Sequence, residues 1–280
     1  MVKIITDTTS CLPLEISNRY QIPVIPQIIN FGEDSYYEGR DIDNIAFMAR
    51  LKTSSQLPKT AAPPPELFIE EFKLLVPIGE TILCIHPSSE VSGTVRSAIV
   101  AARDFPEADI RIIDTRVIAS PLGTIVQLAA EWADEGCDVE IITERVDSLI
   151  QRCRVYFLVA TLEYLARGGR IGGASALLGS VLQIKPILCL KEGKVDQFER
   201  ERTHKRALAR LKEIVLEQAP HDGNAHLSIM HAGVPEAANA LAAELGGVIK
   251  QPYVRIADMP PAIITHGGPG VLGVGFFVQE

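Results

Sequence analysis

Residues 80–103 read ETILCIHPSSEVSGTVRSAIVAAR, a short apolar run followed by a polar loop and a second apolar segment. The run Ile82–Ile85 has the length and β-branched composition of a buried strand. By contrast, Val95, Ile99 and Val100 recur at the spacing of a helix face. The stretch therefore predicts a strand, a turn and a helix.

The triplet Ser92-Gly93-Thr94 lies where the predicted helix begins. Side-chain oxygens at this position can cap a helix, and a glycine lets the backbone come close to a ligand. The unpaired N–H groups and the positive end of the helix dipole attract anions. We expect the acid group of a ligand to bind here, and an ordinary N-cap without a ligand is the alternative.

The order of strand, polar turn and helix recurs elsewhere in the chain. Val2–Thr6 is an apolar run followed by Asp7, and Ala108–Asp114 is another that ends in Asp114. Connections long enough to hold a helix favour parallel strands, and parallel sheets bind ligands beyond the carboxyl ends of their strands. We therefore expect Asp7, Ser92 and Asp114 to lie near such ends.

The second part of the chain connects its predicted strands differently. A turn at Glu192-Gly193 joins two predicted strands directly, which makes them antiparallel. We predict an α/β protein of two domains with the ligand between them. Residues 1–160 form a largely parallel sheet flanked by helices, and residues 161–280 form a mixed-sheet α/β domain.

Four segments carry more ambiguous signals. Ile22–Asn30 is predicted as a strand that lies at a sheet edge or in an irregular run, because two prolines interrupt it. Lys52–Pro65 lacks periodicity and is predicted as a functional or disordered loop. Ala174–Leu182 is apolar on almost every side, which predicts a helix buried in core or against a cavity. Tyr253–Phe277 is predicted as two strands around a glycine-rich turn that carries His266 into a cleft.

Length and composition bound the class of protein. At 280 residues and 47% hydrophobic content, the chain suffices for one large or two medium globular domains. Neither an apolar run of about 18 residues nor a signal peptide is visible, so we expect a cytoplasmic protein without stable membrane insertion. The five cysteines are scattered singly, which argues against disulfides and zinc. We expect no metal and no cofactor.

Charge is distributed unevenly along the chain. The net charge of −8 argues against nucleic-acid binding. Residues 1–150 hold 12 basic and 23 acidic residues (−11), and residues 151–280 hold 15 and 12 (+3). Arg152–Lys212 alone has 13 basic and 5 acidic residues, an excess of 8. This segment is a candidate docking surface for an acidic or phosphate-bearing partner, and a solvated face without a partner is the alternative.

Common catalytic motifs are missing from the sequence. It contains no phosphate-binding glycine-lysine loop, no His-Glu-x-x-His and no Gly-x-Ser-x-Gly. Ser92 and His266, with Asp7 or Asp114, have the residue types of a small serine hydrolase, which is our second hypothesis. His266 as a satisfied core histidine is the simpler alternative. A structural or regulatory binding module without an apolar tunnel is the third hypothesis.

Six short motifs follow one another over nearly the whole chain. They are IITDTT at 4–9, KTAAP at 59–63, SSEVSGT at 88–94, IDT at 113–115, TLEYLARGGRI at 161–171 and HGGPGVLG at 266–273. Together, and in this order, they resemble the DegV family of bacterial fatty-acid-binding proteins. Better-understood members of that family act as the lipid-carrying subunit of fatty acid kinase.

The resemblance implies a carrier that performs no catalysis itself. It implies that the chain binds a long-chain fatty acid, presents its carboxylate to the ATP-dependent catalytic subunit of a fatty acid kinase and holds the acyl phosphate. By the family pattern, Thr60, Ser92, the Gly93 N–H group and His266 hydrogen-bond the carboxylate. The tail would enter an apolar tunnel between the two domains, with Ala174–Leu182 as the candidate wall.

The resemblance also concerns the partner. It implies that Arg170 and Arg202 face the kinase or its phosphates. Two departures from the family pattern are visible. The family has Thr-Ser-Gln-Pro where this chain has Ala61 and Ala62 after its threonine, and it has His-Thr-Gly where this chain has Gly267 after its histidine. We expect these changes to alter hydrogen bonding around the headgroup.

Overall fold

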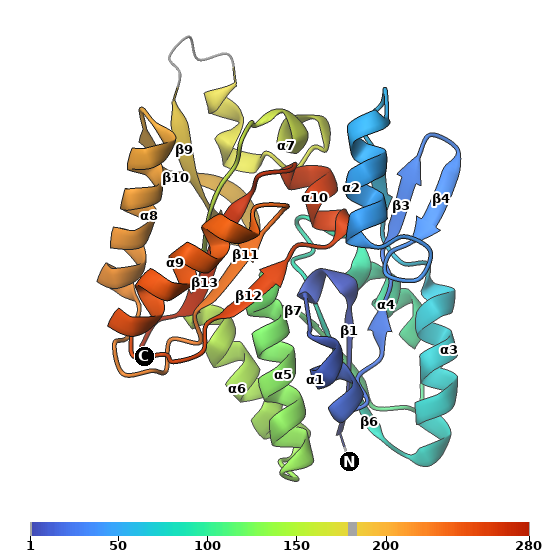
Figure 1. Cartoon of the computed structure of the whole chain (residues 1–280). Coiled ribbons are helices and arrows are strands. Elements are labelled where there is room, and N and C mark those ends of the chain that lie inside the picture. The colour runs from blue at the N-terminus through green and yellow to red at the C-terminus, as the bar shows by residue number, and fades with distance from the viewer. Residues whose placement is uncertain (1, 179–183, 280) are drawn as a thin grey trace. The chain divides into compact units, whose positions relative to one another are not determined.

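The computed structural model describes residues 2–178 and 184–279, and the chain forms two compact units (Figure 1). Unit 1 comprises Met1–Gln151 and Pro260–Ala262, and unit 2 comprises Arg152–Met259 and Ile263–Glu280. The predicted α/β class, with a parallel sheet early in the chain and a mixed sheet later, is confirmed. The division into domains at residue 160 stays a prediction.

The main sheet of unit 1 has four strands, and every neighbouring pair is parallel. In order across the sheet they are β2 (Val24–Ile25), β1 (Val2–Asp7), β6 (Thr81–His86) and β7 (Ile110–Asp114). Parallel neighbours require crossover connections, and the predicted alternation of strand and helix supplies them.

Buried apolar side chains lie on both faces of this sheet. Phe68 and Phe72 pack with Ile5 on one face, and the alternating residues Leu83 and Ile85 are fully buried as well. The helices of unit 1 are η1 (Thr8–Ser10), α1 (Leu14–Arg19), α2 (Asn44–Thr53), α3 (Pro65–Leu75), η2 (Val76–Ile78), α4 (Thr94–Ala102), α5 (Ser120–Asp134) and α6 (Val139–Arg152). The predicted strand and helix of residues 80–103 correspond to β6 and α4.

A three-stranded antiparallel sheet, ordered β4-β3-β5, also belongs to unit 1. The segment predicted as one strand at Ile22–Asn30 forms two, because β2 and β3 (Ile28–Phe31) lie on either side of Pro26 in different sheets. The predicted edge position is confirmed for β2, the outermost strand of the parallel sheet. The segment predicted as a loop contains β5 (Lys59–Ala61), and β4 spans Asp34–Tyr37. Neither short strand has the apolar alternation that predicts a strand.

Unit 2 contains a six-stranded mixed sheet. In order across the sheet its strands are β10 (Lys194–Glu201), β9 (Lys185–Lys191), β8 (Cys153–Leu158), β13 (Leu272–Phe277), β11 (Ser228–His231) and β12 (Arg255–Asp258). Only β11 and β12 are parallel. The predicted turn between β9 and β10 is confirmed, with positive φ at Glu192 and Gly193, as two-residue hairpins require.

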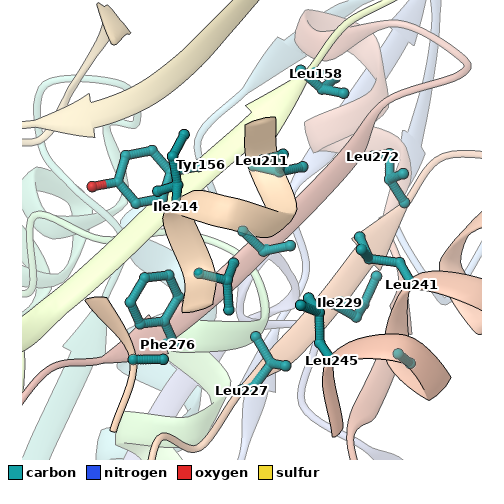
Figure 2. Close-up of a cluster of buried hydrophobic side chains, with 14 of the residues drawn as sticks. Tyr156, Leu158, Leu211, Ile214, Leu227, Ile229, Leu241, Leu245, Leu272 and Phe276 are labelled. Carbon is teal, nitrogen blue, oxygen red and sulfur yellow. The ribbon is translucent and has the colours of Figure 1, made fainter. Parts of the chain in front are cut away.

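Two amphipathic helices form the core of unit 2 with this sheet. Figure 2 shows Leu211 and Ile214 of α8 and Leu241 of α9 among side chains of the strands, including Ile229 and Phe276. The helices of unit 2 are α7 (Glu163–Arg167), η3 (Gly172–Leu177), α8 (His204–Gln218), α9 (Pro235–Val248) and α10 (Pro261–Gly267), the last beginning in unit 1. No helix within the described ranges is long and apolar enough to cross a bilayer.

Two predicted elements need correction. In place of the helix predicted at Ala174–Leu182, the chain forms the short 3-10 helix η3, which ends at Leu177. Its first residue, Gly172, has φ 51°, which does not fit an α-helix. The rest of that prediction lies at residues 179–183, outside the described residues. The turn predicted to carry His266 is instead the last turn of α10, whose β-branched Ile263 to Thr265 favoured a strand by composition.

Candidate functional site

Polar residues gather at the carboxyl ends of the parallel strands in unit 1. β1 ends at Asp7, β6 at His86 and β7 at Asp114, and the register places His86 beside Asp114. Asp114 accepts hydrogen bonds from the Ser89 backbone and hydroxyl, so it orders the loop that follows β6. The predicted placement of acidic residues at strand ends is confirmed.

Asp7 is the centre of a buried hydrogen-bond network. Its Oδ2 lies 2.8 Å from His86 Nδ1, and both side chains are fully buried. Its Oδ1 accepts from Thr9 N at 3.0 Å, from Thr9 Oγ1 at 2.5 Å and from Gln27 Nε2 at 3.1 Å. A carboxylate removed from water is unstable unless donors surround it, and these groups supply them.

The network continues from Asp7 to the start of α4. Gln27 Nε2 also donates to Thr94 Oγ1 at 2.8 Å, and Thr94 Oγ1 lies 2.8 Å from Ser92 Oγ. Gln27 and Thr94 were not identified as site residues from the sequence. Thr94 belonged to the predicted capping triplet, whereas nothing in the local sequence distinguishes Gln27 from an ordinary polar residue after a proline.

The first turn of α4 has free backbone donors. Gly93 is the N-cap residue and makes no side-chain cap, while Thr94 N donates to Ser92 Oγ at 3.3 Å. Within the described part of the chain, the N–H group of Gly93 has no acceptor. Ser92 and Gly93 are only half-buried, so an anion can reach both at the positive end of the helix.

Thr60 lies in β5, in a segment that reaches the same loop. It pairs with Ile29 of β3, and the chain then runs two residues further to Ala62. A Cβ atom added to Gly93 would lie 3.1 Å from the Ala62 Cβ atom. The structure therefore brings the Lys59–Ala62 segment and the Ser92-Gly93 turn together within unit 1.

His266 lies in unit 2, against the motif that follows β8. A Cβ atom on Gly168 would lie 2.2 Å from His266 Nδ1, and one on Gly268 would lie 2.5 Å from the Tyr164 ring. Arg170 Nη1 donates to the Gly168 carbonyl at 2.7 Å. Gly168 and Gly268, one from each sequence motif, are thus required by close packing of one motif on the other.

The electrostatics of His266 follow from this packing. Burial, together with the positive charge of Arg170, lowers the pKa of the imidazole to about 4. At neutral pH the ring is therefore uncharged and can donate one hydrogen bond, rather than form an ion pair.

Glu38 is a second unusual acid that sequence analysis missed. It is 2% exposed and accepts a hydrogen bond from Ala262 N at 2.6 Å. Burial raises its pKa to about 7, although the hydrogen bonds from Thr8 and Ala262 oppose the shift. The surrounding residues 32–43 are acidic and rich in turn-forming residues, a composition typical of an exposed loop.

The arginines predicted to contact a partner differ in exposure. Arg170 is half-buried, whereas Arg202 is exposed immediately before α8. Part of the basic excess of this region is neutralised locally. Arg210 pairs with Glu199, Glu213 and Glu217, and Lys212 pairs with Glu244 on α9.

No geometric observation favours the hydrolase hypothesis. The hydroxyl of Ser92 pairs with that of Thr94, and the imidazole that pairs with Asp7 is His86. All five cysteines are free thiols. Among residues 2–178 and 184–279, no three His, Cys, Asp or Glu side chains are arranged to hold a metal ion.

Fold and site define a two-unit α/β protein with polar donors at the end of a parallel sheet. A family model described as an uncharacterised protein of the DegV family matches residues 1–279. The DegV domain-containing protein SCO2569 of Streptomyces coelicolor is 36% identical over 278 residues, covering 98% of this chain and 97% of that protein. The chain belongs to the DegV family.

Solved structures agree with this assignment. A DegV family protein from Thermus thermophilus, described by its fatty acid binding, has a TM-score of 0.90 and 31% identity, with 99% of each chain covered. The fatty acid binding DegV family protein SAG1342 from Streptococcus agalactiae has a TM-score of 0.91 and 30% identity, covering 100% of this chain and 99% of that one.

Proposed function

We propose that this protein binds a long-chain fatty acid. The observation that carries the proposal is the likeness, over 99% or more of the chain, to solved proteins described as fatty acid binding. The half-buried donors at the start of α4 support it independently, because they suit an acceptor such as a carboxylate.

The headgroup is held by hydrogen bonds in this proposal. The Ser92 hydroxyl, the Gly93 N–H group and Thr60 serve as its ligands from unit 1, and the neutral His266 imidazole serves from unit 2. Donors of this kind orient a carboxylate without a full ion pair. Because the imidazole is uncharged, it forms no ion pair with the carboxylate, and the bound fatty acid can dissociate again.

The alkyl tail supplies the affinity. Burying about 15 methylenes at ~0.8 kcal/mol each contributes roughly 12 kcal/mol before costs. Association itself costs about 4 to 15 kcal/mol, so the tail offsets that cost and the polar groups decide which end goes where. Residues 174–178 are the described part of the proposed tunnel wall, and among them Ala174 and Leu177 are buried.

The protein then presents the bound carboxylate to the ATP-dependent catalytic subunit of a fatty acid kinase and carries the acyl phosphate. Arg170 and Arg202 dock that subunit or its phosphates. In an assay with such a subunit and ATP, Arg202→Ala lowers acyl phosphate formation about tenfold. Arg103→Ala, an exposed arginine of unit 1, leaves it unchanged. Equal rates for both variants would remove Arg202 from the docking surface.

Lipid extraction tests the binding proposal directly. Protein purified from a bacterial host releases a long-chain fatty acid, which mass spectrometry identifies. Ser92→Ala raises the Kd for palmitic acid about tenfold, the effect of one lost charge-assisted hydrogen bond. The control is Ser17→Ala, because the Ser17 hydroxyl bonds only the Leu14 carbonyl of its own helix, α1. Failure to find or to bind any fatty acid would refute the proposal.

A further inference from the structure

The Gln27 side chain joins Asp7 to the start of α4 through its amide nitrogen. Nε2 donates to Asp7 Oδ1 at 3.1 Å and to Thr94 Oγ1 at 2.8 Å, which uses both amide hydrogens. Gln27 is 3% exposed, and the other two side chains are fully buried. The nitrogen, rather than the amide oxygen, must face Asp7, because an ionised carboxylate only accepts hydrogen bonds.

The orientation of the Gln27 amide also decides which hydroxyl donates in the hydrogen bond between Thr94 and Ser92. Because Thr94 Oγ1 accepts from Gln27, its own hydrogen points to Ser92 Oγ, at 2.8 Å. If Ser92 donated instead, the Thr94 hydrogen would have no other acceptor in the described part of the chain, at a position with no solvent exposure. A buried hydroxyl hydrogen without an acceptor is unfavourable, so Thr94 is the donor.

Ser92 Oγ consequently receives two hydrogens. One comes from the Thr94 hydroxyl and the other from Thr94 N, at 3.3 Å. A serine hydroxyl has two acceptor lone pairs and one hydrogen. With both lone pairs occupied, the half-buried Ser92 offers a ligand only its hydrogen.

We propose that Asp7, Gln27 and Thr94 are positioning residues that hold Ser92 as a hydrogen-bond donor, so that the site selects a headgroup which only accepts. The inference rests on the proposed function and narrows it to the carboxylate form of the ligand. A primary amide with the same tail has N–H groups that find no acceptor at Ser92, and it binds more weakly for that reason.

The test compares palmitic acid with palmitamide, whose tails are identical, by equilibrium binding to the full-length protein. Thr94→Val keeps the shape of the side chain but removes the donor to Ser92, which can then rotate and accept. The ratio of acid to amide affinity falls about tenfold in this variant. Thr94→Ser, which keeps the hydroxyl, retains the wild-type ratio.

Two further variants complete the experiment. Gln27→Met removes the donor that fixes Thr94, and the affinity ratio falls several-fold. Thr124→Val is the matched control, because Thr124 is a buried helical threonine whose hydroxyl bonds only the Ser120 carbonyl of its own helix. A wild-type ratio in folded Thr94→Val or Gln27→Met overturns this inference alone. Wild-type protein that binds neither ligand overturns the proposed function together with it.

Discussion

The polar groups of unit 1 and those around His266 in unit 2 are held in place by opposite means. In unit 1, Asp7, Gln27 and Thr94 fix one another through hydrogen bonds between side chains. In unit 2, His266 is fixed by the space that Gly168 leaves and by burial. Polar networks of the first kind tolerate little change in chemistry, whereas packing of the second kind tolerates little change in volume.

The two regions also respond to pH in opposite directions. Glu38 of unit 1 has a pKa raised to about 7 from 4.5, so the stability it contributes is present below pH 4.5 and is lost as the pH rises through 7. His266 has a pKa lowered to about 4 from 6.5, so its contribution is present above pH 6.5 and is lost as the pH falls through 4.

Replacing Glu38 or His266 singly isolates the pH-dependent contribution of each side chain to the free energy of unfolding. Relative to wild type, Glu38→Gln gains stability as the pH rises from 4.5 to 7, by about 3 kcal/mol in total. His266→Asn gains a similar amount as the pH falls from 6.5 to 4. Urea unfolding at a series of pH values measures both differences. Differences that stay constant with pH in either variant would contradict the assigned pKa shift.

A methyl group at Gly168 tests whether space alone positions His266. In Gly168→Ala the new Cβ atom would lie 2.2 Å from His266 Nδ1 and 3.0 Å from the Tyr164 carbonyl oxygen, so the imidazole must move. We expect a loss of about 2 kcal/mol of stability in thermal unfolding, together with weaker palmitic acid binding.

The control for this substitution lies in α9. Gly247→Ala meets no atom within 4 Å and replaces a helical glycine, so it stabilises the protein by up to about 1 kcal/mol. Equal melting temperatures for the two variants would show that the contact with His266 carries no strain.

The smallest effect concerns the packing of Ala62 on Gly93 in unit 1. Gly93→Ala places a Cβ atom 3.1 Å from the Ala62 Cβ atom, a contact that a small shift can relieve. We expect a loss of about 1 kcal/mol, of which the double variant with Ala62→Gly recovers about half. A double-mutant cycle in urea measures this coupling, and strictly additive effects would show that the two residues do not contact each other.

Sequence patterns predicted the elements whose apolar residues repeat regularly. β6 and α4 follow from the run at Ile82–Ile85 and the spacing of Val95 and Ile99, because buried faces require that repeat. β5 escaped prediction because it has three residues and is half exposed. Its place depends on pairing with β3, which is not encoded in neighbouring residues.

The polar groups of the candidate site could be identified from the sequence only in part. Ser92 and Gly93 precede a helix with a recognisable start, and His266 stands in a glycine-rich motif. Gln27 and Glu38 gave no signal, because their roles arise from partners 67 and 224 residues away along the chain. Burial of a polar side chain is a property of the folded chain, so composition cannot reveal it.

Glu38 also changes how many protons the folded protein holds. The formal charge of −8 counts every carboxylate as ionised, yet with a pKa of about 7 Glu38 is protonated in about half of the folded molecules at pH 7. His266 has the opposite effect, because at pH 7 about a quarter of the unfolded chains carry a proton on this imidazole and lose it on folding. This loss cancels only part of the proton uptake by Glu38. Taken together, these two groups take up a fraction of a proton on folding at pH 7, and the heat measured by calorimetry then includes the ionisation enthalpy of the buffer that supplies it.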